Sequence, residues 1–81
     1  MRVYAILVSQ GNDLFYLSGK AVIQTIKKHH GMVAQRGYDQ TKYLTCLVFP
    51  KMLDRNRCAE EFRKLNIKFD TRDDGNIDDL K

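Results

Sequence analysis

The chain has 81 residues, 43% of them hydrophobic and only one of them proline, which excludes intrinsic disorder and leaves room for one small domain. No stretch approaches the roughly 18 consecutive apolar residues of a membrane span, and no secretory signal pattern is present, so we expect a cytoplasmic protein. Residues 1–68 carry twelve Lys and Arg against five Asp and Glu, whereas residues 69–81 carry two against five. A basic body with an acidic end is typical of proteins that bind polyanions.

The first predicted element is a strand at about residues 2–9, because the run VYAILV is apolar without interruption. A helix follows and reaches about His30, since apolar residues then recur at helical spacing. It begins either near Phe15 or after Ser18, which is a favourable N-cap. Gly31, directly after His30, is a typical helix stop.

Two strands and a turn are predicted next. Residues 32–38 form the second strand, Asp39 and Gln40 form the turn, and residues 41–49 form the third strand with the apolar run YLTCLVF. Pro50 ends this strand because proline cannot donate to the ladder.

The second helix is predicted to begin at Asp54, which serves as its N-cap, with Leu53 and Cys58 in contact across the cap. Asn66 then ends the helix in a left-handed conformation. Residues 67–71 alternate apolar and polar side chains, which is the pattern of an edge strand.

This order of elements predicts an α+β domain over residues 1–72 with the ferredoxin-like βαββαβ fold. In that fold an antiparallel four-stranded sheet carries two helices on one face, and the first and third strands are central. The letters DDGN at residues 73–76 predict a turn, so residues 73–81 are expected to form an acidic C-terminal tail. Both central strands are apolar on both faces, so the second face needs a cover. We expect that cover to be a second copy in a homodimer, a partner protein or stacked bases.

Lysines on the first helix indicate nucleic-acid binding, because cations that recur at helical spacing can follow a phosphate backbone. Solvation of an exposed helix face explains the same residues equally simply. Cations also flank the turn between the second and third strands, next to tyrosines, as they do in nucleic-acid platforms. The predicted nucleic-acid-binding residues are Lys20, Lys27, Lys28, Arg36 and Lys42.

Aromatic and apolar side chains on the central strands and beside the turn predict a partner interface on the open face of the sheet. Tyrosine is enriched in protein interfaces, and stacked bases are the alternative because aromatic rings also stack on nucleotides. The third strand lacks the glycine-spaced aromatic signature of an RNA-recognition motif. The predicted interface residues are Tyr4, Tyr38, Tyr43, Leu47 and Phe49.

No motif identifies a reaction, a metal, a cofactor or a small-molecule substrate. His29 and His30 are adjacent on a helix and therefore point about 100° apart, so they do not converge on one ion. Cys46 and Cys58 have neither CxxC spacing nor a supporting ladder of histidines and cysteines, which indicates reduced, structural cysteines.

The element order, with no shared motif, resembles that of the Cas2 family and related small ferredoxin-like endoribonucleases. This resemblance implies a metal-dependent nuclease that dimerises across its sheets, with an acidic residue closing the first strand. That position holds Ser9 or Gln10 here, and the nearest acid is Asp13. Two subunits would have to bring Asp13 onto one metal ion.

The sequence therefore predicts a small binding or regulatory protein rather than an enzyme. Its expected target is nucleic acid or a nucleic-acid-handling protein, a pattern common among regulators and phage or mobile-element inhibitors. It is expected to form a homodimer and to act away from membranes. A Cas2-like endoribonuclease and a purely structural or protein-interaction dimer are the alternatives.

Overall fold

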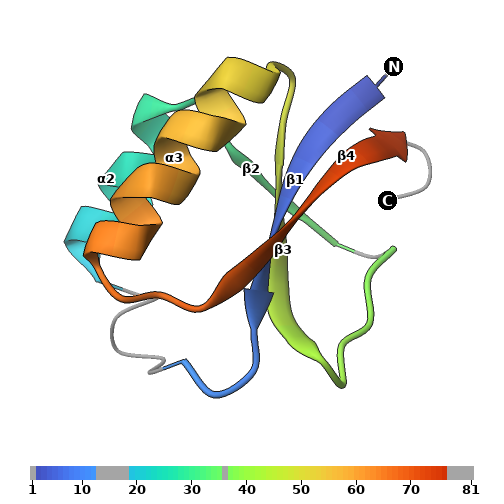
Figure 1. The fold of residues 1–81 in the computed structure, drawn as a ribbon, viewed down its shortest axis with the longest axis horizontal. Helices are drawn as coiled ribbons and strands as arrows, with labels where there is room; N and C mark the ends of the chain where they lie inside the picture. The colour runs from blue at the N-terminus through green and yellow to red at the C-terminus, as the bar shows by residue number, and fades with distance from the viewer. Residues whose placement is uncertain (1, 13–18, 36, 77–81) are drawn as a thin grey trace.

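The computed structural model describes residues 2–12, 19–35 and 37–76, and it shows the α+β arrangement that the sequence predicts (Figure 1). Within these residues, four strands and two helices follow one another in the order of a ferredoxin-like fold. Their bounds are β1 (Arg2–Ser9), α2 (Lys20–Lys28), β2 (Met32–Ala34), β3 (Tyr43–Phe49), α3 (Met52–Lys64) and β4 (Phe69–Asn76). Neither of these helices is long and apolar enough to cross a membrane.

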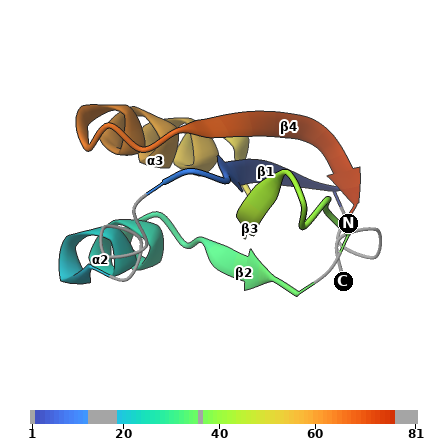
Figure 2. The same ribbon diagram turned by 90° about the horizontal axis from the view of Figure 1, so that it is seen from below.

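The sheet is antiparallel throughout, in the order β2-β3-β1-β4. β1 and β3 are therefore the central strands, as their uninterrupted apolar runs predict. Both helices lie on the same side of the sheet (Figure 2). Because each helix buries an apolar stripe, this side holds the main core. The buried residues of the main core are Ile6, Val8, Val22, Leu47, Phe49, Cys58, Ala59, Phe62 and Ile67.

The opposite face of the sheet also carries apolar side chains, and they too are buried. Tyr38 and Tyr43 pack against them. A shift in the register of β1 and β3 next to Ser9 turns Tyr43 toward this face. The chain itself therefore buries this cluster, whereas the expected homodimer or partner protein stays a prediction. The buried residues of this second cluster are Val3, Ala5, Leu7, Ala34, Cys46 and Val48.

The start of α3 differs from its prediction. Its N-cap is Lys51 rather than Asp54, because no residue after Pro50 prevents the helix from forming as soon as the chain has turned. Asp54 lies instead in the first turn, where a carboxylate is favourable beside the positive end of the helix dipole. Leu53 is 58% exposed whereas Cys58 is fully buried, so Leu53 is not buried across the cap as predicted.

Three strands also differ in their bounds from the predictions, and β3 begins at Tyr43 rather than at residue 41. β2 ends at Ala34 rather than at Tyr38, and β4 continues to Asn76 through the predicted turn at residues 73–76. Backbone pairing with β1 extends β4, since Asn76 pairs with Arg2. Residues 73–76, expected to begin the acidic tail, are therefore the last part of an edge strand. Residues 77–81 lie outside the described residues.

The residues that end the two helices have left-handed backbone conformations. Asn66 has a φ of 60°, which confirms its prediction, and His30 has a φ of 62° after α2. Because His30 already takes the left-handed conformation that ends α2, Gly31 is needed for another reason. A Cβ at Gly31 would lie 2.7 Å from Cε2 of Phe49 and 2.9 Å from Cγ2 of Ile26, so glycine allows the chain to cross directly over the core.

A buried arginine of α3, Arg55, joins β1 to β4. The ladder between these strands is irregular between Val3 and Ala5, where two residues of β4 lie opposite one residue of β1. At this bulge Nη1 of Arg55 donates to the carbonyl oxygens of Ala5 (3.4 Å) and Arg72 (3.3 Å). The same nitrogen pairs with the carboxylate of Asp73. The guanidinium therefore supplies donors where the ladder is interrupted.

Arg55→Met should lower the free energy of unfolding by roughly 1–3 kcal/mol, because methionine fills similar space but leaves buried carbonyl groups without a donor. Urea denaturation followed by circular dichroism measures this change. Arg57→Met, on the exposed side of the same helix, is the matched control. Its free energy of unfolding should stay within about 0.5 kcal/mol of that of the parent. Equal stability of the two variants would show that Arg55 does not hold β1 to β4.

Gly31→Ala should destabilise the protein by about 1–3 kcal/mol, since the new Cβ overpacks the ring of Phe49. The same substitution in a Phe49→Leu background should cost less, because the smaller side chain leaves room for it. Thermal denaturation of the parent, the two single variants and the double variant measures this coupling. Purely additive effects would exclude the ring contact as the reason for glycine at this position.

Candidate nucleic-acid interface

α2 is an amphipathic helix whose inner side chains pack into the main core and whose outer side chains are basic. Val22 is buried in the core with Ile26 packed against it, whereas Lys20 and Lys27, on the outer side, are exposed. From Lys20 to Ala34 the chain holds three lysines and two histidines but no acidic residue. An anion that approaches α2 therefore meets no opposing charge from this segment.

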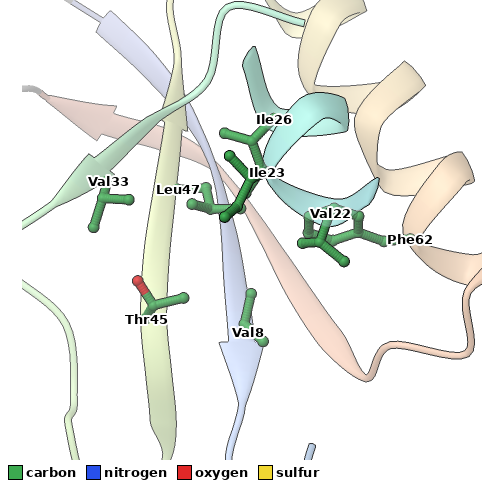
Figure 3. A pocket seen from close by; sticks show the side chains of 8 residues that line it. All are labelled: Val8, Val22, Ile23, Ile26, Val33, Thr45, Leu47 and Phe62. Carbon is green, nitrogen blue, oxygen red and sulfur yellow. The ribbon is translucent and has the colours of Figure 1, made fainter. Parts of the chain in front are cut away.

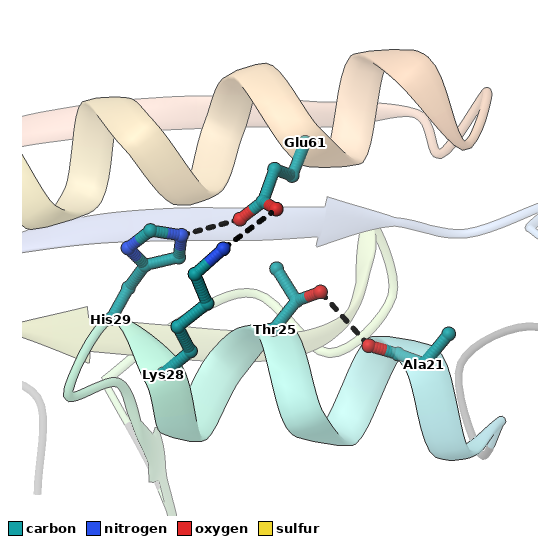
Figure 4. A network of polar contacts seen from close by, with 5 residues as sticks. All are labelled: Ala21, Thr25, Lys28, His29 and Glu61. Carbon is teal, nitrogen blue, oxygen red and sulfur yellow. Dashed lines mark hydrogen bonds and ion pairs between the residues drawn. The ribbon is translucent and has the colours of Figure 1, made fainter.

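An acidic side chain of α3 fixes the position of α2 (Figure 4). One carboxylate oxygen of Glu61 contacts Nε2 of His29, which is buried, and the other lies 3.4 Å from Nζ of Lys28. The hydrogen bond with His29, aided by Lys28, outweighs burial and keeps the pKa of Glu61 below its ordinary value of 4.5. Within α2, the hydroxyl of Thr25 donates to the carbonyl of Ala21 over 2.8 Å. The contacts of Glu61 therefore tie the end of α2 to the middle of α3.

Lys64 of α3 lies across the space between the two helices from the lysines of α2, so it enlarges their positively charged surface. This space is an open pocket of about 240 Å³, and Lys64 is exposed at its side, as the lysines of α2 are. The prediction from sequence omitted Lys64, because its position beside α2 depends on helix packing that residue spacing does not reveal. The pocket is lined by Ala21, Thr25, Glu61, Lys64 and Leu65. We call Lys20, Lys27, Lys28 and Lys64 the basic helical surface.

The other cations of the predicted nucleic-acid site do not join the basic helical surface. Lys42 belongs to the connection between β2 and β3, which both views place at the end of the sheet away from α2 (Figures 1 and 2). Its Nζ lies 5.3 Å from the centroid of the Tyr43 ring, and the interaction with Tyr43 raises the pKa of Lys42. The Tyr43 hydroxyl in turn donates to Asp70 over 2.8 Å. Arg36 lies outside the described residues.

The five residues predicted as a partner interface do not form one surface. Leu47 and Phe49 lie on the helix-covered face and are buried in the main core, so the prediction of an exposed position for them is corrected. Tyr38 and Tyr43 are half-buried over the second cluster. Tyr4 is half-buried beside the arginine of α3 that joins β1 to β4. An uninterrupted apolar strand has no alternation, so its sequence does not indicate which residues face the helices.

A pocket that the sequence did not indicate lies between α2 and the edge of the sheet (Figure 3). We call it the α2–β2 pocket. It has a volume of about 220 Å³. Ile23 of α2 (42% exposed) and Val33 of β2 (57% exposed) form part of its lining. Apart from Thr45, its lining is apolar: Val8, Val22, Ile23, Ile26, Val33, Thr45, Leu47 and Phe62. Exposed apolar side chains beside an apolar pocket are typical of a contact site.

The described residues assemble no metal site, and their two cysteines are not activated as nucleophiles. No group of three or more His, Cys, Asp and Glu among them could hold a metal ion. Cys46 and Cys58 are free and buried, and burial raises the pKa of Cys46 to about 11 and that of Cys58 to about 12. Their reactive thiolate forms are therefore scarce near neutral pH. Asp13, the acid that a Cas2-like nuclease would use, lies outside the described residues.

No family model, curated protein or solved structure matches this chain. Its function must therefore be inferred from its own residues, above all from the basic helical surface and the α2–β2 pocket.

Glu61→Gln should reduce the loss of stability in acid. A carboxyl group whose pKa is lowered on folding stabilises the protein above its unfolded pKa, and this contribution is lost as the pH falls through the folded pKa. The parent should therefore lose more unfolding free energy than Glu61→Gln between about pH 6 and about pH 3. Urea titrations at several pH values measure the difference, with the exposed neighbour Glu60→Gln as the matched control. Parallel acid profiles for the parent and Glu61→Gln would contradict a stabilising role for the contacts of Glu61.

Proposed function

We propose that this protein binds nucleic acid by its phosphate backbone through the basic helical surface, without catalysing a reaction. The observation that carries the proposal is a group of four exposed lysines on two neighbouring helices. Three of them lie in a segment without any acidic residue, and Glu61 of α3 is the acid that pairs with one of them, Lys28. Lysine ammonium groups act as point charges toward phosphate. Each phosphate that they neutralise releases counterions, and this release drives the binding.

Binding of this kind is independent of base sequence. Tyr38 and Tyr43 are half-buried against the second cluster, which argues against a sheet surface on which bases stack. Phosphate contacts position a nucleic acid but carry little sequence information. We therefore expect different base sequences to bind with similar affinity and with a strong dependence on salt.

A protein partner is the second candidate, and the α2–β2 pocket favours it. A phosphate backbone gains nothing from an apolar pocket, whereas a protein side chain does. The two candidate sites meet at Lys20 and Lys27 of α2, whereas Lys64 belongs to the basic helical surface alone and Ile23 to the pocket alone.

Fluorescence anisotropy with a labelled DNA duplex at about 50 and about 200 mM salt tests nucleic-acid binding. Because Lys28 pairs with Glu61, phosphate contacts by the other three lysines predict a slope of about −2.7 for the logarithm of the association constant against the logarithm of salt concentration. Affinity should therefore fall about 40-fold across this range. Lys27→Gln combined with Lys64→Gln should flatten the slope by about 1.8, because two phosphate contacts are lost.

Lys42→Gln is the matched control for Lys27→Gln, because each removes one exposed lysine and only Lys27 belongs to the basic helical surface. Lys42→Gln should leave the salt dependence of the association constant the same as in the parent. Equal effects of the two substitutions would assign the binding to net charge rather than to this surface. No binding of the parent at about 50 mM salt would refute the proposed function.

A further inference from the structure

β2 is an edge strand whose outer side is available for pairing. It pairs with β3 through Met32, Val33 and Ala34, and no other strand of the described residues pairs with it. An edge strand of this kind presents backbone donors and acceptors to a second chain. Natural edge strands are protected by charged side chains or by being very short. β2 has only three residues and so offers few ladder hydrogen bonds, but none of its side chains is charged. The edge is therefore suited to receive a further strand.

The α2–β2 pocket opens directly beside this edge (Figure 3). Val33 lies opposite Leu47 in the ladder, so both side chains point to the helix-covered side, where Ile23 and Ile26 of α2 help to line the pocket. Its volume of about 220 Å³ exceeds the roughly 150 Å³ of an engineered cavity that binds benzene. One branched aliphatic side chain of an added strand therefore fits next to Val33.

Charge identifies the kind of chain that suits this edge. Lys20 and Lys27 lie one turn to either side of Ile23 on α2, and no acid occurs from Lys20 to Ala34. A second copy that paired through β2 about a two-fold axis would bring two such cationic segments together, which is unfavourable. An acidic segment is attracted by the same charges. A nucleic acid has no peptide groups with which to continue the ladder.

We propose that the β2 edge binds an extended segment of a partner protein, rich in acidic and aliphatic residues, as a fifth strand of the sheet. One aliphatic side chain of this segment enters the α2–β2 pocket. Hydrogen bonds to the backbone of β2 supply affinity, while the pocket and the lysines of α2 supply specificity. This binding goes beyond the proposed nucleic-acid contact and does not depend on it, although Lys20 and Lys27 border both surfaces.

The probe is a fluorescein-labelled peptide of about ten residues in which glutamate alternates with isoleucine, titrated with the full chain and followed by anisotropy. A peptide with lysine in place of glutamate should bind at least about ten-fold more weakly, because Lys20 and Lys27 repel it. The glutamate peptide with its alternate amides N-methylated should show a similar loss, because it cannot continue the ladder. Both comparisons use the unaltered protein, so neither depends on how well a variant folds.

Ile23→Gln should weaken binding of the glutamate peptide at least about ten-fold, since it places a polar group in the lining of the pocket. Leu53→Gln is the matched control, because Leu53 is an exposed apolar residue of α3 outside the pocket lining. Lys64→Gln should weaken nucleic-acid binding and leave peptide binding unchanged. Failure of one proposal can therefore be distinguished from failure of the other.

Three outcomes would overturn strand addition by an acidic partner. The first is equal affinity for the glutamate and lysine peptides, and the second is equal affinity for the methylated and unmethylated peptides. The third is a parent dimer in sedimentation equilibrium that Ile23→Gln converts to a monomer, since this would assign the edge to a second copy of the chain.

Discussion

Burial of the two central strands on both faces is the constraint on which the rest of the structure depends. β1 and β3 present apolar side chains to both sides of the sheet, and each fully buried Val, Leu, Ile or Phe contributes about 1.5–3 kcal/mol relative to exposure. α2 and α3 cover one side, while Tyr38 and Tyr43 pack on the other. A small domain uses most of its chain for this covering. Its contacts with other molecules are therefore expected at the margins, on the outer side of the helices and at the edge of the sheet.

The parts of the structure that the sequence predicted depend on local patterns, and the parts that it missed depend on contacts between distant segments. Apolar runs identified β1 and β3 as central strands, and Asn66 was recognised as the end of α3. Arg55, by contrast, is one cation among several in its helix, and its role follows from a bulge that only the pairing of β1 with β4 creates. Lys64 joins the lysines of α2 only after the helices have packed. The side to which Leu47 points could not be predicted, because its strand is apolar on both faces.

α2 connects these features, because each of its sides has a different neighbour. Its inner side completes the main core through Val22. One flank is held against α3 by the contacts of Glu61 with Lys28 and His29, and the other flank borders the α2–β2 pocket through Ile23. A small rotation of α2 would therefore change the spacing of the lysines and the shape of the pocket together. The contacts of Glu61 restrain that rotation, which gives an ion pair at the surface a role in shaping both candidate sites.

The two edges of the sheet are unequal, and this difference limits how large an assembly the protein can build. β4 carries Asp70, Arg72 and Asp73 and is interrupted by a bulge, and charges and bulges both discourage edge strands from pairing. β2 has three uncharged residues and an unshifted register with β3, so only its short length protects it. The sheet can therefore be extended at one edge only. A strand that joins β2 adds one strand to the sheet, and the protected edge of β4 opposes the edge-to-edge stacking of successive molecules into a fibre. If a partner strand adds to β2 as proposed, we therefore expect finite complexes in which each molecule holds a single added strand.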